Sequence, residues 1–132
     1  MSYYISKKIE SSHEQAIEKL TEALKEEGFG VLSHIDIHSK LYEKLGVGFR
    51  KYSILGACSP KHAYQALQKE DKVGTMLPCN VIVQQLENGM VEIAAVNPVA
   101  SMMAIDNPEL IKVAEEKKRN SPVLLNRLNK FH

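Results

Sequence analysis

Residues 79–96 read CNVIVQQLENGMVEIAAV and carry the strongest local structural signal of the chain. Two runs rich in apolar residues flank Asn88-Gly89, the dipeptide most typical of a two-residue turn between antiparallel strands. The pattern predicts a β-hairpin whose strands cover residues 79–86 and 90–96. Pro78 precedes the first strand, where the ladder needs no N–H donor.

Outward from this hairpin, alternating apolar residues predict further strands over 3–9, 29–38 and 51–58. A helix is predicted up to about residue 27, with Ser11–Glu14 or Ser12–Gln15 as its capping box and Gly28 as its stop. Ser59-Pro60 begins a helix that ends near residue 70, and Asn107-Pro108 begins another that extends to about residue 120. Residues 39–45 are compatible with a short helix, and residues from 121 onward with a kink or a last helix.

The predicted fold class is therefore α+β. We expect one domain over residues 1–132, with a single mostly antiparallel sheet of about five strands. The expected element order is β-α-β-β-α-β-β-α, with the helices packed mainly on one face of the sheet.

Composition excludes several classes of protein. The 132 residues are 44% hydrophobic and 25% charged, typical of a globular chain and unlike a disordered or low-complexity one. Lys and Arg number 17 against 16 Asp and Glu, so the positive charge that nucleic-acid binding needs is missing. No apolar run reaches the ~18–20 residues of a membrane span, and the first residues do not resemble a signal peptide. We expect a cytoplasmic protein without a membrane or nucleic-acid partner, whose two cysteines are thiols.

Cys58 lies where a strand is predicted to pass into a helix. A helix N-terminus carries partial positive charge, and Lys61 and His62 follow in the first turn. Such a place can lower a thiol pKa and produce a nucleophile, or bind an anion through free backbone N–H groups and Lys61. The plainer alternative is a small buried residue that seals the junction.

Cys79 and Asn80 begin the hairpin and are candidates to join Cys58, Ser59 and Lys61 in contacting a ligand. Two thiols can bind a soft metal or form a disulfide, although two sulfurs alone do not complete a zinc site. The alternative is a structural cysteine at the start of a buried strand, with Asn80 bonded to backbone.

The pattern His34-x-Asp36-x-His38 places two imidazoles and a carboxylate at alternate positions of a predicted strand. Side chains two apart on a strand point the same way, so the three form a candidate site for a divalent metal such as zinc. The alternative is a solvated sheet face, on which polar residues also alternate.

A family resemblance appears in a set of spaced motifs. They are Tyr52-Ser53-Ile54-Leu55-Gly56-Ala57-Cys58-Ser59-Pro60, Ala63, Ala66-Leu67, Gly74, Leu77-Pro78-Cys79-Asn80-Val81, Ile35-Asp36-Ile37, Glu43-Lys44-Leu45-Gly46, Gly89 and Asn97-Pro98. Over roughly residues 30–115 the chain resembles the bacterial and archaeal domain of unknown function 302 family. One departure is Ser59, where the family usually has Asn, a residue that also caps helices. The resemblance implies a compact α+β domain, often a homodimer, and no established reaction.

Three functions follow as hypotheses. The first is a homodimeric binding module for a small ligand, anion or divalent metal, near Cys58 or on the His34/Asp36/His38 face. The second is a thiol-dependent enzyme or redox sensor that uses Cys58 with help from Lys61 or His62. The third is a structural domain that binds a partner protein through a sheet face or an edge strand.

Overall fold

The computed structural model describes residues 2–102, 105 and 107–116. Its elements are β1 (Tyr4–Glu10), α1 (His13–Glu26), β2 (Gly30–Asp36), α2 (Ile37–Leu45), β3 (Tyr52–Cys58), α3 (Pro60–Lys69), η1 (Asp71–Met76), β4 (Cys79–Gln85), β5 (Met90–Val96), α4 (Pro98–Met102) and a helix over 108–116. The predicted last helix lies outside the described residues. None of the helices described is long and apolar enough to cross a bilayer.

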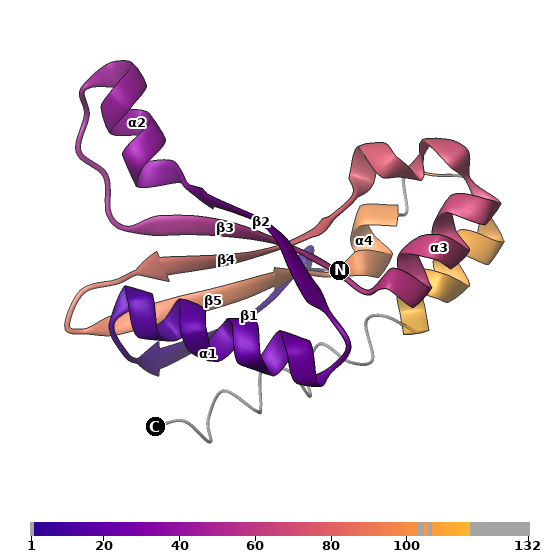
Figure 1. Ribbon diagram of the computed structural model, residues 1–132, viewed down its shortest axis with the longest axis horizontal. Coiled ribbons are helices and arrows are strands. Elements are labelled where there is room, and N and C mark those ends of the chain that lie inside the picture. Colours follow the sequence, from indigo (N-terminus) through magenta and orange to yellow (C-terminus); the bar gives the residue numbers. More distant parts are fainter. Residues whose placement is uncertain (1, 103–104, 106, 117–132) are drawn as a thin grey trace.

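The five strands form a single antiparallel sheet in the order β1-β5-β4-β3-β2, which confirms the predicted fold class (Figure 1). The hairpin between β4 and β5 is also as predicted. Asn88 and Gly89 adopt φ values of 61° and 73°, the left-handed backbone that a tight turn with this hand requires.

The main core lies between α1 and one face of the sheet. Leu20, Leu24 and Ala16 of α1 are buried against inward-facing side chains that include Leu55 and Ile93. Apolar residues at helical spacing meet apolar residues at alternate strand positions, so both periodicities bury the same layer.

Ser12 caps α1, because its side chain accepts the N–H of Gln15 at 3.2 Å. Of the two predicted capping registers, the second is therefore the correct one. Gly28 follows the helix with a φ of 83°, in the left-handed conformation expected of the residue that ends it.

The opposite side of the sheet is formed by the alternate residues that point away from α1. We call it the uncovered face, and its residues include Tyr52, Ile54, Asn80, Ile82, Gln84, Glu92 and Ala94. Asn80 is exposed and the others are partly exposed, whereas their strand neighbours on the α1 side are mostly buried. Within the described part of the chain, this difference leaves the uncovered face open to a ligand or a partner.

A second, smaller core lies at one end of the sheet (Figure 1). It joins α3, η1, α4 and the helix over 108–116 through seven buried residues, which are Ala66, Val73, Val99, Met102, Leu110, Val113 and Ala114. The helices are thus divided, since α1 lies against the sheet while this group lies beyond its end.

The segment after β2 departs in part from the prediction. A strand was expected to residue 38, with residues 39–45 compatible with a short helix that the predicted element order did not include. In the structure β2 ends at Asp36, and α2 begins at Ile37 and ends at Leu45. Alternation of apolar and polar residues continues past Asp36, yet Asp36 occupies the N-cap of α2 in extended conformation. Helix α2 projects outward from the end of β2, contacts β3 through His38 and Tyr52, and has no buried residue (Figure 1).

Strands β2 and β3 approach closely at Gly56. A Cβ added at this glycine would meet the Oγ of Ser33 and would lie 2.7 Å from Cγ of Pro78. Only hydrogen fits there, so Gly56 allows the chain before β4 to pack against the sheet.

Candidate functional site

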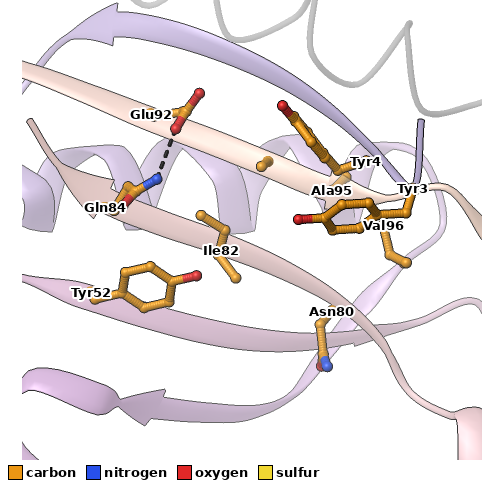
Figure 2. Close-up of a pocket in the computed structure, with 10 residues that line it drawn as sticks. Tyr3, Tyr4, Tyr52, Asn80, Ile82, Gln84, Glu92, Ala95 and Val96 are labelled. Carbon is orange, nitrogen blue, oxygen red and sulfur yellow. Dashed lines mark hydrogen bonds between the residues drawn. The ribbon is translucent and has the colours of Figure 1, made fainter.

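A hollow of about 380 Å³ opens on the uncovered face (Figure 2). It is lined by Tyr3, Tyr4, Tyr52, Asn80, Ile82, Gln84, Glu92, Ala94, Ala95 and Val96. The lining comes from β1, β3, β4 and β5 and from the residue before β1. Strand alternation brings the even-numbered residues of β3, β4 and β5 to this face, so an ordinary sheet pattern produces the floor of the hollow.

Aromatic rings stand at both ends of the hollow. Tyr3 and Tyr4 meet edge to face with ring centroids 5.0 Å apart, and Tyr52 stands at the opposite side (Figure 2). Buried Asn97 holds the first pair in place, because its N–H donates to the carbonyl of Tyr3 at 2.8 Å and its side-chain amide donates to that of Ser2 at 3.1 Å. Asn97 thereby positions a wall of the hollow.

A row of hydrogen bonds between side chains crosses the floor of the hollow. Arg50 donates through Nε to Oε1 of Gln84 at 2.9 Å, and Gln84 donates through Nε2 to Oε1 of Glu92 at 2.7 Å. The Arg50 guanidinium carbon also lies 4.4 Å from the ring centroid of Phe49 and 5.7 Å from that of Tyr52. These contacts fix the orientation of the Gln84 amide, since one end accepts and the other donates.

A second polar cluster lies on the α1 side, near the N-terminus of α1. Oγ of Ser53, which is fully buried, donates to Oδ1 of Asp36 at 2.6 Å and lies 2.8 Å from Nε2 of His13. His34 contacts the same carboxylate oxygen through Nε2 at 2.7 Å. Because a carboxylate only accepts, the Ser53 proton goes to Asp36 and His13 donates through Nε2.

The protonation states in this cluster follow from its contacts. Burial lowers the pKa of His13 below its ordinary value and keeps the ring neutral. The hydrogen bond from Ser53 lowers the pKa of Asp36 and keeps it ionised. Ser53 has no exposed surface and cannot reach a substrate. The cluster therefore joins α1, β2 and β3 and is no nucleophilic triad.

The proposed metal triad is only partly assembled. His34 and Asp36 are in contact, but the expectation that His38 shares their strand face is wrong, because His38 belongs to α2. Its Nδ1 accepts the backbone N–H of Tyr52 at 2.9 Å. Among the described residues, no group of three or more His, Cys, Asp or Glu side chains is arranged to hold a metal ion. Binding of zinc by these residues stays a prediction.

The Cys58 junction has the predicted backbone. Cys58 ends β3, Ser59 is the N-cap of α3 and Pro60 is its first residue. The Ser59 hydroxyl, however, contacts Nδ1 of His62 at 2.8 Å and makes no capping hydrogen bond with the helix backbone. The helix start is thus built mainly by Pro60 and backbone geometry.

Lys61 and His62, which were expected to assist Cys58, lie near the carboxylate of Glu116. Nζ of Lys61 lies 3.7 Å, and Nε2 of His62 3.6 Å, from Oε1 of Glu116. Cys58 is partly exposed, and its activation stays a prediction.

The two cysteines lie on neighbouring strands. Cys79 pairs with Ala57 in the sheet, so it points to the α1 side while Cys58 points to the uncovered face. The suggestion that these thiols form a pair is therefore not supported by the strand register. Asn80, in contrast, lines the hollow. Of the predicted ligand-contacting residues, it is the one placed there.

Sequence reasoning missed most of the hollow and the buried cluster. Ser53 carried a signal, since it is a polar residue at an inward position between apolar ones. Gln84 and Glu92 carried none, because polar residues at alternate positions are usual on a solvated sheet face.

Comparisons with known proteins agree on the family. The model of the family described as "Domain of unknown function DUF302" matches residues 5–127. A crystal structure of an uncharacterized conserved protein DUF302 from Bacillus stearothermophilus is 32% identical, with a TM-score of 0.88, and the match covers 97% of this chain and 99% of that one. No curated protein matches. The match over nearly the whole chain, the shared fold and the motifs around Cys58 and Cys79 together show that this protein belongs to the DUF302 family.

Proposed function

We propose that this protein is a binding module that takes a small organic molecule into the hollow on the uncovered face and acts as a homodimer. The observation that carries the first part is the hollow itself. Ligand pockets usually measure about 300–1,000 Å³ and combine an apolar lining with a few oriented polar groups. This hollow has that size and that combination.

The lining favours a flat ligand. Tyr3, Tyr4 and Tyr52 offer ring faces and edges on both sides, while Ile82 and Ala94 form an apolar floor between them. Aromatic side chains bind planar groups by stacking or edge contacts with little loss of conformational freedom. The fixed amide of Gln84 adds one oriented polar contact. We therefore expect an aromatic or conjugated molecule of modest size.

The homodimer is supported by the segment that leaves the sheet at β2. Six large apolar side chains between residues 32 and 49 are 42–69% exposed, namely Leu32, Ile35, Tyr42, Leu45, Val47 and Phe49. At about 150–250 Å² for a large side chain, their exposed parts amount to roughly 600 Å². A standard interface takes about 800 Å² from each partner, so this apolar area and a polar rim suffice for a second copy.

A second copy is also the occupant that symmetry favours. Most oligomers of one chain are two-fold dimers in which the same patch meets itself. On α2, Tyr42 and Leu45 lie three residues apart and so share one side of the helix, which the same side of a second copy can cover.

Nuclear magnetic resonance tests ligand binding with a neutral probe, 4-hydroxybenzamide. Amide resonances of Asn80, Ile82 and Ala94 should shift during titration, while those of α1 stay unchanged. Ala94→Phe, which fills the floor, should abolish the shifts. Ala63→Phe places the same side chain on α3 and should leave them intact. Binding that is equally strong in the Ala94→Phe variant would reject the hollow as the site.

Light scattering after size-exclusion chromatography tests the homodimer. Tyr42 on α2 and Tyr64 on α3 are similarly exposed, at 69% and 66%. Tyr42→Glu should convert the protein to a monomer, whereas Tyr64→Glu should leave the dimer intact. A wild-type monomer at 50–100 µM, or a dimer that persists in Tyr42→Glu, would contradict the proposed surface.

A further inference from the structure

Contacts fix the orientation of the Arg50 guanidinium but involve only part of its hydrogen-bonding capacity. Its Nε donates to Gln84, and its carbon lies over Phe49 at 4.4 Å and near Tyr52 at 5.7 Å. Within the described part of the chain, its two terminal nitrogens make no hydrogen bond and its side chain is in no ion pair. An arginine held between rings and an amide loses little freedom when it binds.

The position of Arg50 connects it to the hollow. Gln84, which accepts its hydrogen bond, lines the hollow and also a second depression, which Arg50 and Lys8 line as well. A ligand that lies on Ile82 and against Tyr52 can therefore extend past Gln84 toward the open edge of the guanidinium.

The charges near Arg50 cancel, so the total charge does not select an anion. Glu92 is the cross-strand neighbour of Lys8, and Glu87 lines the same depression as Arg50. Directly opposed charges on neighbouring strands offset each other. The geometry of the guanidinium can still select an anion, since its parallel N–H donors match the two oxygens of a carboxylate.

We infer that Arg50 is a specificity-determining residue that binds the carboxylate of a planar aromatic or conjugated acid whose ring occupies the hollow. The inference rests on the proposed binding function and names the class of its ligand. A single fork with one positive charge suits a carboxylate. The carboxylate accepts hydrogen bonds from the two terminal nitrogens, while Nε still donates to Gln84.

The test compares two molecules of the same shape. 4-Hydroxybenzoate carries a carboxylate where 4-hydroxybenzamide carries a neutral amide. In the wild-type protein the carboxylate should bind at least tenfold more tightly, measured as Kd by titration of the Asn80 and Ala94 resonances. Arg50→Gln should remove this preference, so that the Kd values of the carboxylate and the amide become nearly equal in that variant.

Lys51→Gln is the matched control, because it removes one positive charge from the adjacent residue. Lys51 pairs with Glu14 on the α1 side at 2.8 Å, so this variant should retain the tenfold preference. Arg50→Lys keeps the charge but lacks the planar fork, and it should retain less than a third of the preference.

The outcomes separate the two proposals. If neither probe binds, both the proposed function and the role of Arg50 are overturned. If both probes bind equally to the wild-type protein, or if the preference survives Arg50→Gln, the hollow remains a binding site and only the role of Arg50 is overturned. A preference lost equally in Lys51→Gln would show an effect of net charge and would also overturn it.

Discussion

Replacement of Ser53 by alanine tests whether the buried cluster stabilises the fold. The change removes one hydroxyl, which has no exposed surface and lies between Nε2 of His13 at 2.8 Å and Oδ1 of Asp36 at 2.6 Å. Alanine has nearly the same volume, so packing changes little. The main consequence is the loss of two hydrogen bonds at the junction of α1, β2 and β3.

The two lost hydrogen bonds differ in how much free energy their loss costs. A buried donor left without an acceptor costs about 1–3 kcal/mol, and His13 loses its acceptor in a site that water does not reach. The Asp36 side chain is 44% exposed, so water replaces most of its lost hydrogen bond. We expect the free energy of unfolding to fall by about 2–3 kcal/mol. For a chain of this length the fall corresponds to a Tm lower by roughly 6–15 °C.

Urea unfolding at pH 7, followed by circular dichroism at one chain concentration, measures this difference. Ser6→Ala, at an exposed position of β1, is the control and should stay within about 0.5 kcal/mol of the wild type. Combining Ser53→Ala with His13→Leu removes the unpaired donor, so the double variant should be less destabilised than the sum of the single ones. A Ser53→Ala protein within 0.5 kcal/mol of the wild type would refute the reasoning.

Four further changes have expected outcomes. Since burial lowers the pKa of His13, this side chain takes up a proton at higher pH in the unfolded state than in the folded state. The free energy of unfolding should therefore fall as pH drops below about 6.5, and it should fall less steeply in His13→Gln. Urea titrations at pH 7.5 and pH 5 measure this difference. Gly56→Ala should cost about 1–3 kcal/mol through its close contacts, whereas Gly30→Ala, with nothing within 4 Å of the new Cβ, should not; equal stability of the two would contradict the packing argument. Ser12→Ala should cost about 0.5–2 kcal/mol by loss of the α1 cap, and the same change at the preceding serine should cost less. If Cys58 is the reactive thiol, Cys58→Ser should abolish the fast phase of labelling by a maleimide in the native protein, and an unchanged fast phase would remove the thiol-enzyme hypothesis.

The fold could be predicted wherever one local signal dominated. Asn88-Gly89 identified the hairpin because few dipeptides accept two consecutive positive φ values. The boundary between β2 and α2 could not be predicted in the same way. Ile35, Asp36 and Ile37 alternate as a strand would. Asp36 precedes α2 without a capping hydrogen bond from its side chain, and its carboxylate binds Ser53 instead, so no capping signal marks the boundary.

The candidate site was harder to predict than the fold. Its lining comes from strands that are distant in sequence, so no spacing could reveal that Tyr3 and Tyr52 share one hollow. Arg50 precedes β3 and had no motif around it. His34 and Asp36 were predicted to share one strand face, and in the structure they are in contact on β2. The larger cluster around them could not be predicted, because it depends on the inward position of Ser53 and on the start of α1 at His13. Polar contacts between distant elements depend on register, which composition does not encode.

Helix α2 has a consequence for how the protein behaves on dilution. A helix of nine residues with no buried side chain has little to hold it besides its own backbone hydrogen bonds and the contact of His38 with the backbone of Tyr52. Isolated helices shorter than about 12–15 residues are marginal in water. If a second copy covers it, its helicity depends on chain concentration. Far-ultraviolet ellipticity should then weaken as the protein is diluted while the sheet remains folded, and the amide hydrogens of α2 should exchange with solvent at a rate set by dissociation. Assembly could thus be followed through the backbone of one helix without any label.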